Sequence, residues 1–123
     1  MLSGREEFSG FCLCNNVALA ADMALNNGAN KVFILDFDVH HGQGTQDFFA
    51  KDPRVVYFST HRYQNGAFWP HLRRGHCDYV GEGEGKGTTA NVPLNETGCT
   101  NADYMTIVFQ VSSIAQLLYI FER

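Results

Sequence analysis

The chain has 123 residues, 45% of them hydrophobic, which suits one globular domain with a core. Its formal charge of −4 and its scattered Lys and Arg residues argue against binding nucleic acid through a broad basic surface. The first ten residues lack the apolar segment of a secretory signal, so we expect an intracellular protein of the cytoplasm, the nucleus or both. Four cysteines could form two disulfides, but in such a compartment reduced thiols are expected; they are Cys12, Cys14, Cys77 and Cys99.

The first half of the chain alternates between helical and strand patterns. Asn15 and Asn16 can cap a helix over residues 17–27, and Gly28 suits its C-terminal end. Residues 31–39, "KVFILDFDV", form an apolar run without alternation, typical of a strand covered on both faces. A short helical turn follows over residues 45–53 and ends at a proline, and residues 54–61, "RVVYFSTH", form a second strand.

The second half begins with a long irregular stretch over residues 62–87, and a loop of that length in a compact domain is usually functional or disordered. Residues 88–94, "TTANVPL", predict a third strand. Thr100 and Asp103 resemble a capping box that opens a final helix reaching toward Arg123. Polar residues interrupt that apolar helix, so a packed helix is favoured over a membrane anchor. The order of elements indicates an α/β fold with a parallel sheet.

The end of the first predicted strand carries the strongest chemical signal. In a strand, Asp36, Asp38 and His40 lie on one face, whereas Phe37 and Val39 point to the other face and can bury. Asp and His together suit zinc or another divalent metal, and sites in α/β sheets gather at the carboxyl ends of strands. The alternative is that these polar residues cap a helix or face solvent. Catalytic zinc takes three protein ligands, so a third must come from elsewhere.

Glycines beside this segment and in a later tract have simpler interpretations. Gly42 and Gly44 let the backbone turn sharply after the last metal ligand. The tract over residues 81–87, "GEGEGKG", fits neither a dinucleotide fingerprint nor a Walker motif, because glycine follows Lys86. We interpret this tract as a flexible surface loop that leads into a strand.

Aromatic, histidine and cysteine side chains offer weaker signals. Phe68 and Trp69 follow the second strand and could either wall a ligand cleft or plug the core, which the sequence leaves open. Cys12 has no paired base nearby, so a buried thiol is favoured over a nucleophile. Three histidines show no metal spacing and are expected to be structural or exposed: His61, His71 and His76.

The combination of these segments resembles the zinc-dependent histone deacetylases. The matching segments, in order, are "GFCLCNNVALAA", "ILDFDVHHGQGTQ", "VVYFSTHRY", "FWPHL", "NVPLNETG" and "NADY". The resemblance is closest to class IIb, in particular to the first catalytic domain of the tandem-domain deacetylase that also acts on tubulin. It covers residues 8–104, whereas residues 105–123 form a divergent C-terminal helix. It implies an arginase/deacetylase-like fold with a central parallel sheet flanked by helices, and all of residues 1–123 belong to one partial catalytic domain.

The resemblance implies roles for individual residues. Asp38 and His40 match two of three zinc ligands, and Asp36 matches a carboxylate that supports a catalytic histidine. Asp36 also matches a carboxylate at a structural potassium site, to which Asp38, His40 and Thr60 add their backbone carbonyls and Ser59 its hydroxyl. The substrate of the family is an acetylated protein, such as a histone or tubulin, and zinc polarises its amide carbonyl.

Three further positions match the acyl-lysine tunnel of the family. Phe11 and Trp69 correspond to the aromatic pair that lines the tunnel, and Gly10 corresponds to a residue at its wall. No partner of the nucleic-acid or membrane class is implied.

Other family residues lack a counterpart in this sequence. The tandem histidines should lie about ten residues before Phe11, where Met1 and Leu2 stand, and His40-His41 is the ligand motif instead. The third zinc ligand and an oxyanion-binding tyrosine should lie beyond Arg123. We therefore expect a fragment, from a truncated gene model or a splice product, that is inactive alone. The alternatives are a non-catalytic module that binds partners or competes with the full enzyme, and a different arginase-like hydrolase, against which the aromatic pair argues.

Overall fold

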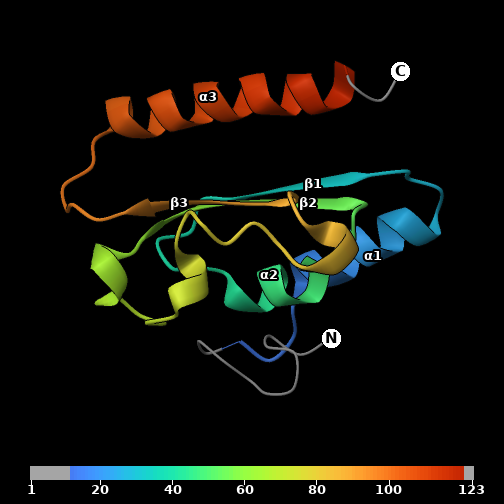
Figure 1. Cartoon of the computed structure of the whole chain (residues 1–123), viewed down its shortest axis with the longest axis horizontal. Coiled ribbons are helices and arrows are strands. Elements are labelled where there is room, and N and C mark those ends of the chain that lie inside the picture. Colours follow the sequence, from blue (N-terminus) through green and yellow to red (C-terminus); the bar gives the residue numbers. More distant parts are fainter. Residues whose placement is uncertain (1–11, 121–123) are drawn as a thin grey trace.

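A computed structural model describes residues 12–120 and shows a parallel three-stranded sheet with helices on both sides (Figure 1). The sheet has the order β1-β2-β3, and both neighbouring pairs of strands are parallel. The regular elements, in chain order, are α1 (Asn16–Asn26), β1 (Val32–Asp36), α2 (Gln43–Phe49), β2 (Val55–Arg62), β3 (Thr89–Leu94) and α3 (Asn101–Ile120). This arrangement confirms the predicted α/β class.

The ends of the helices follow the predicted capping chemistry. Asn15 is the N-cap of α1, and its side-chain oxygen accepts the backbone N–H of Ala18 at 2.8 Å. Gly28 follows the helix with φ +99°, a conformation that favours glycine. At the start of α3, the Asp103 carboxylate accepts the backbone N–H of Thr100 at 2.7 Å. This bond is the reach-back half of a capping box, and it lowers the pKa of the Asp103 carboxyl.

The core lies between the sheet and the α1–α2 layer, on the side of the sheet opposite α3 in Figure 1. Its buried side chains come from both layers, and burying each large apolar side chain contributes roughly 1.5–3 kcal/mol. They are Ala18, Ala21, Leu25, Ile34, Phe49, Val55 and Tyr57. This face of the sheet brings the carboxyl ends of β1 and β2 next to the start of α2.

The other face of β1 is open, which contradicts the prediction of a strand covered on both faces. Phe33 and Leu35 stay 42% and 38% exposed although α3 crosses on this side (Figure 1). Phe37 and Val39, which were expected to bury, are 70% and 45% exposed. The sequence shows that both faces of β1 are apolar. The described residues, however, pack closely against only one of these faces.

The long stretch between β2 and β3 is more ordered than predicted. It contains three short 3₁₀ helices: η1 (Gln64–Gly66), η2 (Arg73–Gly75) and η3 (Gly83–Gly85). The glycine tract lies mostly at the surface and leads into β3, as predicted, but one of its glycines is buried. Gly85 is buried against the backbone of Ala50, where a side chain would clash with the Ala50 carbonyl. Across residues 12–120 we find no helix with the length and apolarity to span a membrane.

Candidate functional site

The predicted metal-binding residues lie in the ligand loop, which we define as residues 37–42 between β1 and α2. The strand itself ends at Asp36, so the prediction that all three residues share a strand face is wrong. Turns bring them together instead: Asp36 Oδ1 accepts the N–H of Asp38 at 3.1 Å, and Asp38 Oδ1 accepts the N–H of His40 at 2.8 Å. Such aspartate turns bend the chain just after the sheet ends.

Asp38 and His40 present two metal-binding atoms to each other. Asp38 Oδ1 lies 3.1 Å from His40 Nδ1, and both side chains are substantially exposed. Two ligands of one tetrahedral zinc ion lie about 3.3 Å apart, given bonds of about 2.0–2.1 Å. At this separation the two atoms can share either a proton or a cation, so the donor pair fits two ligand positions of a zinc site. Within residues 12–120, no group of three His, Cys, Asp or Glu side chains has a metal-binding arrangement.

Aromatic rings hold the imidazole of His40. Phe68 stacks on it, with ring centroids 5.4 Å apart and planes inclined by 13°. Trp69 meets the same imidazole edge-on at 5.6 Å. The guanidinium of Arg62 lies 4.4 Å from the centre of the Phe68 ring, a cation–π contact. Phe68 and Trp69 therefore lie beside the predicted ligand His40 instead of plugging the core.

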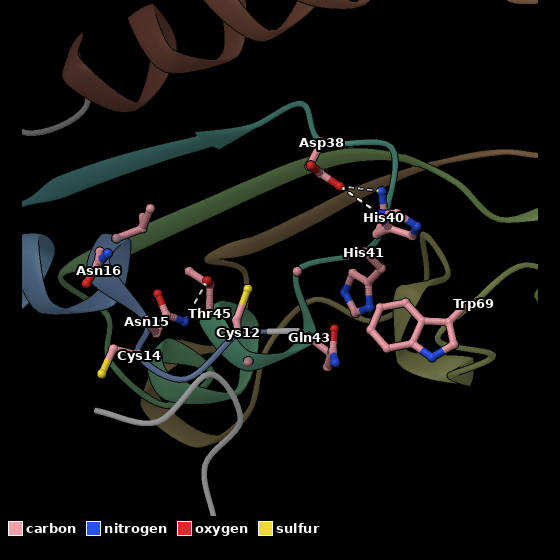
Figure 2. Close-up of a pocket in the computed structure, with 13 residues that line it drawn as sticks. Cys12, Cys14, Asn15, Asn16, Asp38, His40, His41, Gln43, Thr45 and Trp69 are labelled. Carbon is pink, nitrogen blue, oxygen red and sulfur yellow. Dashed lines mark hydrogen bonds and ion pairs between the residues drawn. The ribbon is translucent and has the colours of Figure 1, made fainter. Parts of the chain in front are cut away.

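A cavity of about 340 Å³ opens beside these residues (Figure 2). Trp69, Asp38 and His40 form one side of it, and the start of α1 forms another (Figure 2). Its size is at the small end of the range for ligand sites. The lining residues are Cys12, Cys14, Asn15, Asn16, Val17, Asp38, His40, His41, Gly42, Gln43, Gly44, Thr45 and Trp69.

Asp36 sits below the ligand loop in a tight polar cluster. The Tyr57 hydroxyl donates to Asp36 Oδ2 at 2.8 Å and lies 3.3 Å from the Gly42 carbonyl. Burial and the neighbouring Asp36 charge raise the pKa of Tyr57, so its hydroxyl keeps the proton that it donates. Gly42 is required here for space, because a Cβ would clash with both groups. Its φ is −79°, so the predicted sharp glycine turn is not the reason for this glycine.

The other residues of the predicted potassium site lie next to Asp36. Ser59 pairs with Asp36 in the parallel register of β1 and β2, and Thr60 follows it; both are buried. Ser59 Oγ lies 2.9 Å from His61 Nδ1, and His61 Nε2 donates to the Gly75 carbonyl at 2.9 Å. Because that ring proton is on Nε2, Ser59 donates to Nδ1 and its oxygen lone pairs remain able to accept. Burial, and then the nearby His41, lowers the pKa of His61 to about 4.

Sequence reasoning missed a buried polar cluster behind the ligand loop. His41 Nε2 and Asn91 Nδ2 both lie 2.9 Å from Gln46 Oε1, and Gln46 Nε2 donates to the Arg74 carbonyl at 3.0 Å. Gln46 and His41 are 0% and 2% exposed. Burial lowers the pKa of His41. Asn91 inside a predicted strand was the available signal, because a polar side chain in a buried strand needs a partner.

Sequence-based predictions also concern three residues before α1, namely Gly10, Phe11 and Cys12. Gly10 and Phe11, predicted at the acyl-lysine tunnel, lie outside the described residues. Cys12 is exposed on the cavity wall, so the prediction of a buried thiol is wrong: it precedes α1 and lies outside the core. None of the four cysteines, all of which are described, forms a disulfide.

The sequence matches a family profile described as "Histone deacetylase domain" over residues 3–121. It is 56% identical over 102 residues to histone deacetylase 6 of Caenorhabditis elegans, covering 83% of this chain and 11% of that protein. It is 51% identical over 102 residues to polyamine deacetylase HDAC10 of Homo sapiens, covering 82% of this chain and 15% of that protein. The chain thus spans less than a fifth of the length of these curated relatives.

The fold is also that of known deacetylase structures. The HD domain of HDA15 superposes with a TM-score of 0.80 at 44% identity, over 85% of this chain and 29% of that chain. The histone deacetylase Clr3 superposes with a TM-score of 0.79 at 39% identity, over 88% of this chain and 18% of that chain. These matches confirm the predicted arginase/deacetylase fold and the resemblance to class IIb enzymes.

Proposed function

The chain belongs to the histone deacetylase family, and from this premise we propose that it is the central part of a zinc-dependent lysine deacetylase domain. The substrate proposed is the acetyl-lysine amide of a protein such as a histone or tubulin, in the cytoplasm or the nucleus. One observation carries the proposal: Asp38 Oδ1 and His40 Nδ1 lie 3.1 Å apart on the wall of a cavity that Trp69 also lines.

The residues have separate parts in this reaction. Asp38 and His40 would hold zinc, which when bound supplies a Lewis acid that polarises the amide carbonyl of the substrate. Trp69, with Phe11, would flank the acyl-lysine chain. Asp36 would support a catalytic histidine from another part of the domain, and the Tyr57 hydroxyl fixes its carboxylate for that purpose.

Potassium is proposed as a structural ion of the same region. The Asp36 carboxylate, the Ser59 hydroxyl and the backbone carbonyls of Asp38, His40 and Thr60 would surround it, which leaves the Asp38 and His40 side chains for zinc. The buried Ser59 hydroxyl supports this proposal, because its proton goes to His61 and its lone pairs remain able to accept. Replacing KCl by a lithium salt would then lower the thermal midpoint of the chain, and an identical midpoint would count against the potassium site.

Four relatives raise a choice of substrate, because they are named polyamine deacetylases. An N-acetylpolyamine and an acetyl-lysine present the same acetamide on an alkyl chain, so both compounds belong in the assay. We favour acetyl-lysine, and faster hydrolysis of N-acetylspermidine by a domain that contains this segment would reverse that choice.

The isolated chain is expected to be inactive, because residues 12–120 provide two donors where a catalytic zinc takes three protein ligands. The test is an acetyl-lysine peptide assay on the purified 123-residue chain with added zinc. We expect no turnover above the rate of His40→Ala. Turnover that His40→Ala abolishes would show that the chain is itself an enzyme.

A second candidate is a non-catalytic module that binds a partner or competes with the full enzyme. Exposed apolar side chains favour it, because Phe33 and Leu35 on β1 and Phe37 and Val39 in the loop that follows all remain exposed. Co-purification of tagged chain with a full-length deacetylase tests it, with Phe37→Glu as the disrupting variant. The idea fails if the chain neither unfolds cooperatively nor co-purifies with any protein.

A further inference from the structure

We propose that Gln46 is a positioning residue for the two zinc ligands, acting through His41; the inference rests on the proposed function of Asp38 and His40. The ligand loop is exposed at four of its positions, namely Phe37, Asp38, Val39 and His40. His41 is the next residue and is 2% exposed. Its side chain thus anchors the loop in the protein interior, together with the backbone bond from the Arg62 N–H to the Val39 carbonyl at 2.9 Å.

A single side chain holds that anchor by hydrogen bonding. Because Gln46 Nε2 donates to the Arg74 carbonyl, its Oε1 faces His41 and accepts the ring proton from Nε2 at 2.9 Å. Among the described residues, the other ring nitrogen of His41 is buried and has no hydrogen-bond partner. Gln46 therefore makes the one hydrogen bond that fixes the orientation of this imidazole.

Gln46 is itself fixed from two distant segments. Asn91 of β3 donates to Gln46 Oε1 at 2.9 Å and to the Arg74 carbonyl at 3.1 Å. The Gln46 side chain is fully buried, and a buried amide that has all these partners is costly to move. Hydrogen bonds with β3 and η2 thus fix the carboxamide of Gln46 on α2, and this carboxamide in turn fixes the His41 ring.

The orientation of His41 affects the metal ligands because one peptide bond joins it to His40. His40 precedes His41 directly, and its backbone N–H binds the same Asp38 oxygen that lies 3.1 Å from its ring Nδ1. A rotation of the backbone at His41 therefore changes the separation of the two donor atoms. Groups that orient metal ligands without touching the metal typically change metal affinity 10–100-fold when removed.

The test compares Gln46→Met with Gln110→Met, in which the same replacement is made at an exposed position of α3. Zinc affinity is measured by calorimetry, the His41 Nε2–H by nitrogen-15 NMR, and folding by circular dichroism. We expect Gln46→Met to bind zinc 10–100-fold more weakly and to lose the protected Nε2–H signal, and Gln110→Met to match the wild-type chain. A folded Gln46→Met chain with zinc affinity within twofold of wild type would overturn the proposal.

Two further measurements keep the test decisive. If Gln46→Met does not fold, His41→Leu decides, because it removes the ring that Gln46 orients and leaves Gln46 bonded to Asn91 and Arg74. Zinc binding at least tenfold weaker than wild type supports positioning, and affinity within twofold contradicts it. If the wild-type chain, with two of the three protein ligands among its described residues, binds no zinc, the proposed function is untouched, because it concerns the whole domain. The positioning claim is then decided by amide shifts of Asp38 and His40, which must change in Gln46→Met and stay constant in Gln110→Met.

Discussion

Acidification is expected to destabilise the chain through His61 well before most carboxylates are protonated. The ring is 0% exposed, and its pKa is lowered to about 4, by burial first and then by the nearby His41. In the unfolded chain the pKa returns to about 6.5. The unfolded state therefore binds the proton more tightly, and stability must fall as the pH drops from about 6.5 toward 4.

The size of the effect follows from the two pKa values. Their difference corresponds to about 3 kcal/mol in the free energy of unfolding, of which about 2 kcal/mol is lost between pH 7.5 and pH 5. The lowered pKa of His41 adds a loss of the same sign. Above pH 7.5 neither histidine contributes a pH dependence.

Urea unfolding at pH 7.5, 6 and 5 measures this loss. In His61→Gln the loss between pH 7.5 and 5 should shrink by about 2 kcal/mol, whereas His71→Gln, at an exposed position, should leave it unchanged. An NMR titration of the wild-type chain gives a direct reading that does not depend on how the variant folds. A His61 ring that titrates near 6.5, with stability constant from pH 7.5 to 5, would refute the reasoning.

Three further substitutions, one of them with a control, test the packing below the site and the cap of α3. Gly42→Ala should cost roughly 1–3 kcal/mol, because its Cβ clashes with the Asp36–Tyr57 pair; an unchanged urea midpoint would contradict this. Tyr57→Phe should cost about 1–3 kcal/mol in the same assay, and Tyr79→Phe, whose hydroxyl binds Glu82 near the surface, should cost less; equal losses would count against the buried bond. Asp103→Ala should cost roughly 0.5–2 kcal/mol and speed amide exchange in the first turn of α3, and unchanged exchange there would argue against the cap.

Local chemistry made several elements predictable from the sequence. The Asn15 cap and Gly28 end of α1 depend on neighbouring residues only, and both are found as expected. The strands at β1 and β2 follow from runs of apolar and β-branched residues. Which side chains are buried was harder to predict. Phe37, for example, would be buried only if another layer of the protein covered it.

Contacts between distant segments could not be predicted in this way. Gln46 and Asn91 are 45 residues apart, and nothing in either local pattern indicates that they meet. The role of Gly42 depends likewise on Tyr57, a residue of the neighbouring strand. The pair Asp38 and His40 was predicted by residue type, but the turns that bring their donor atoms together differ from the extended strand expected.

The central claim is that this segment works as part of a zinc-dependent deacetylase domain. The most direct test replaces the matching 102-residue segment of human polyamine deacetylase HDAC10, 51% identical, by that of this chain and measures hydrolysis of acetyl-lysine peptide and N-acetylspermidine. We predict a zinc-containing chimaera that hydrolyses at least one of the two, and loss of both zinc and activity in its His40→Ala variant. A folded, zinc-containing chimaera without activity, or activity that survives His40→Ala, would contradict the account.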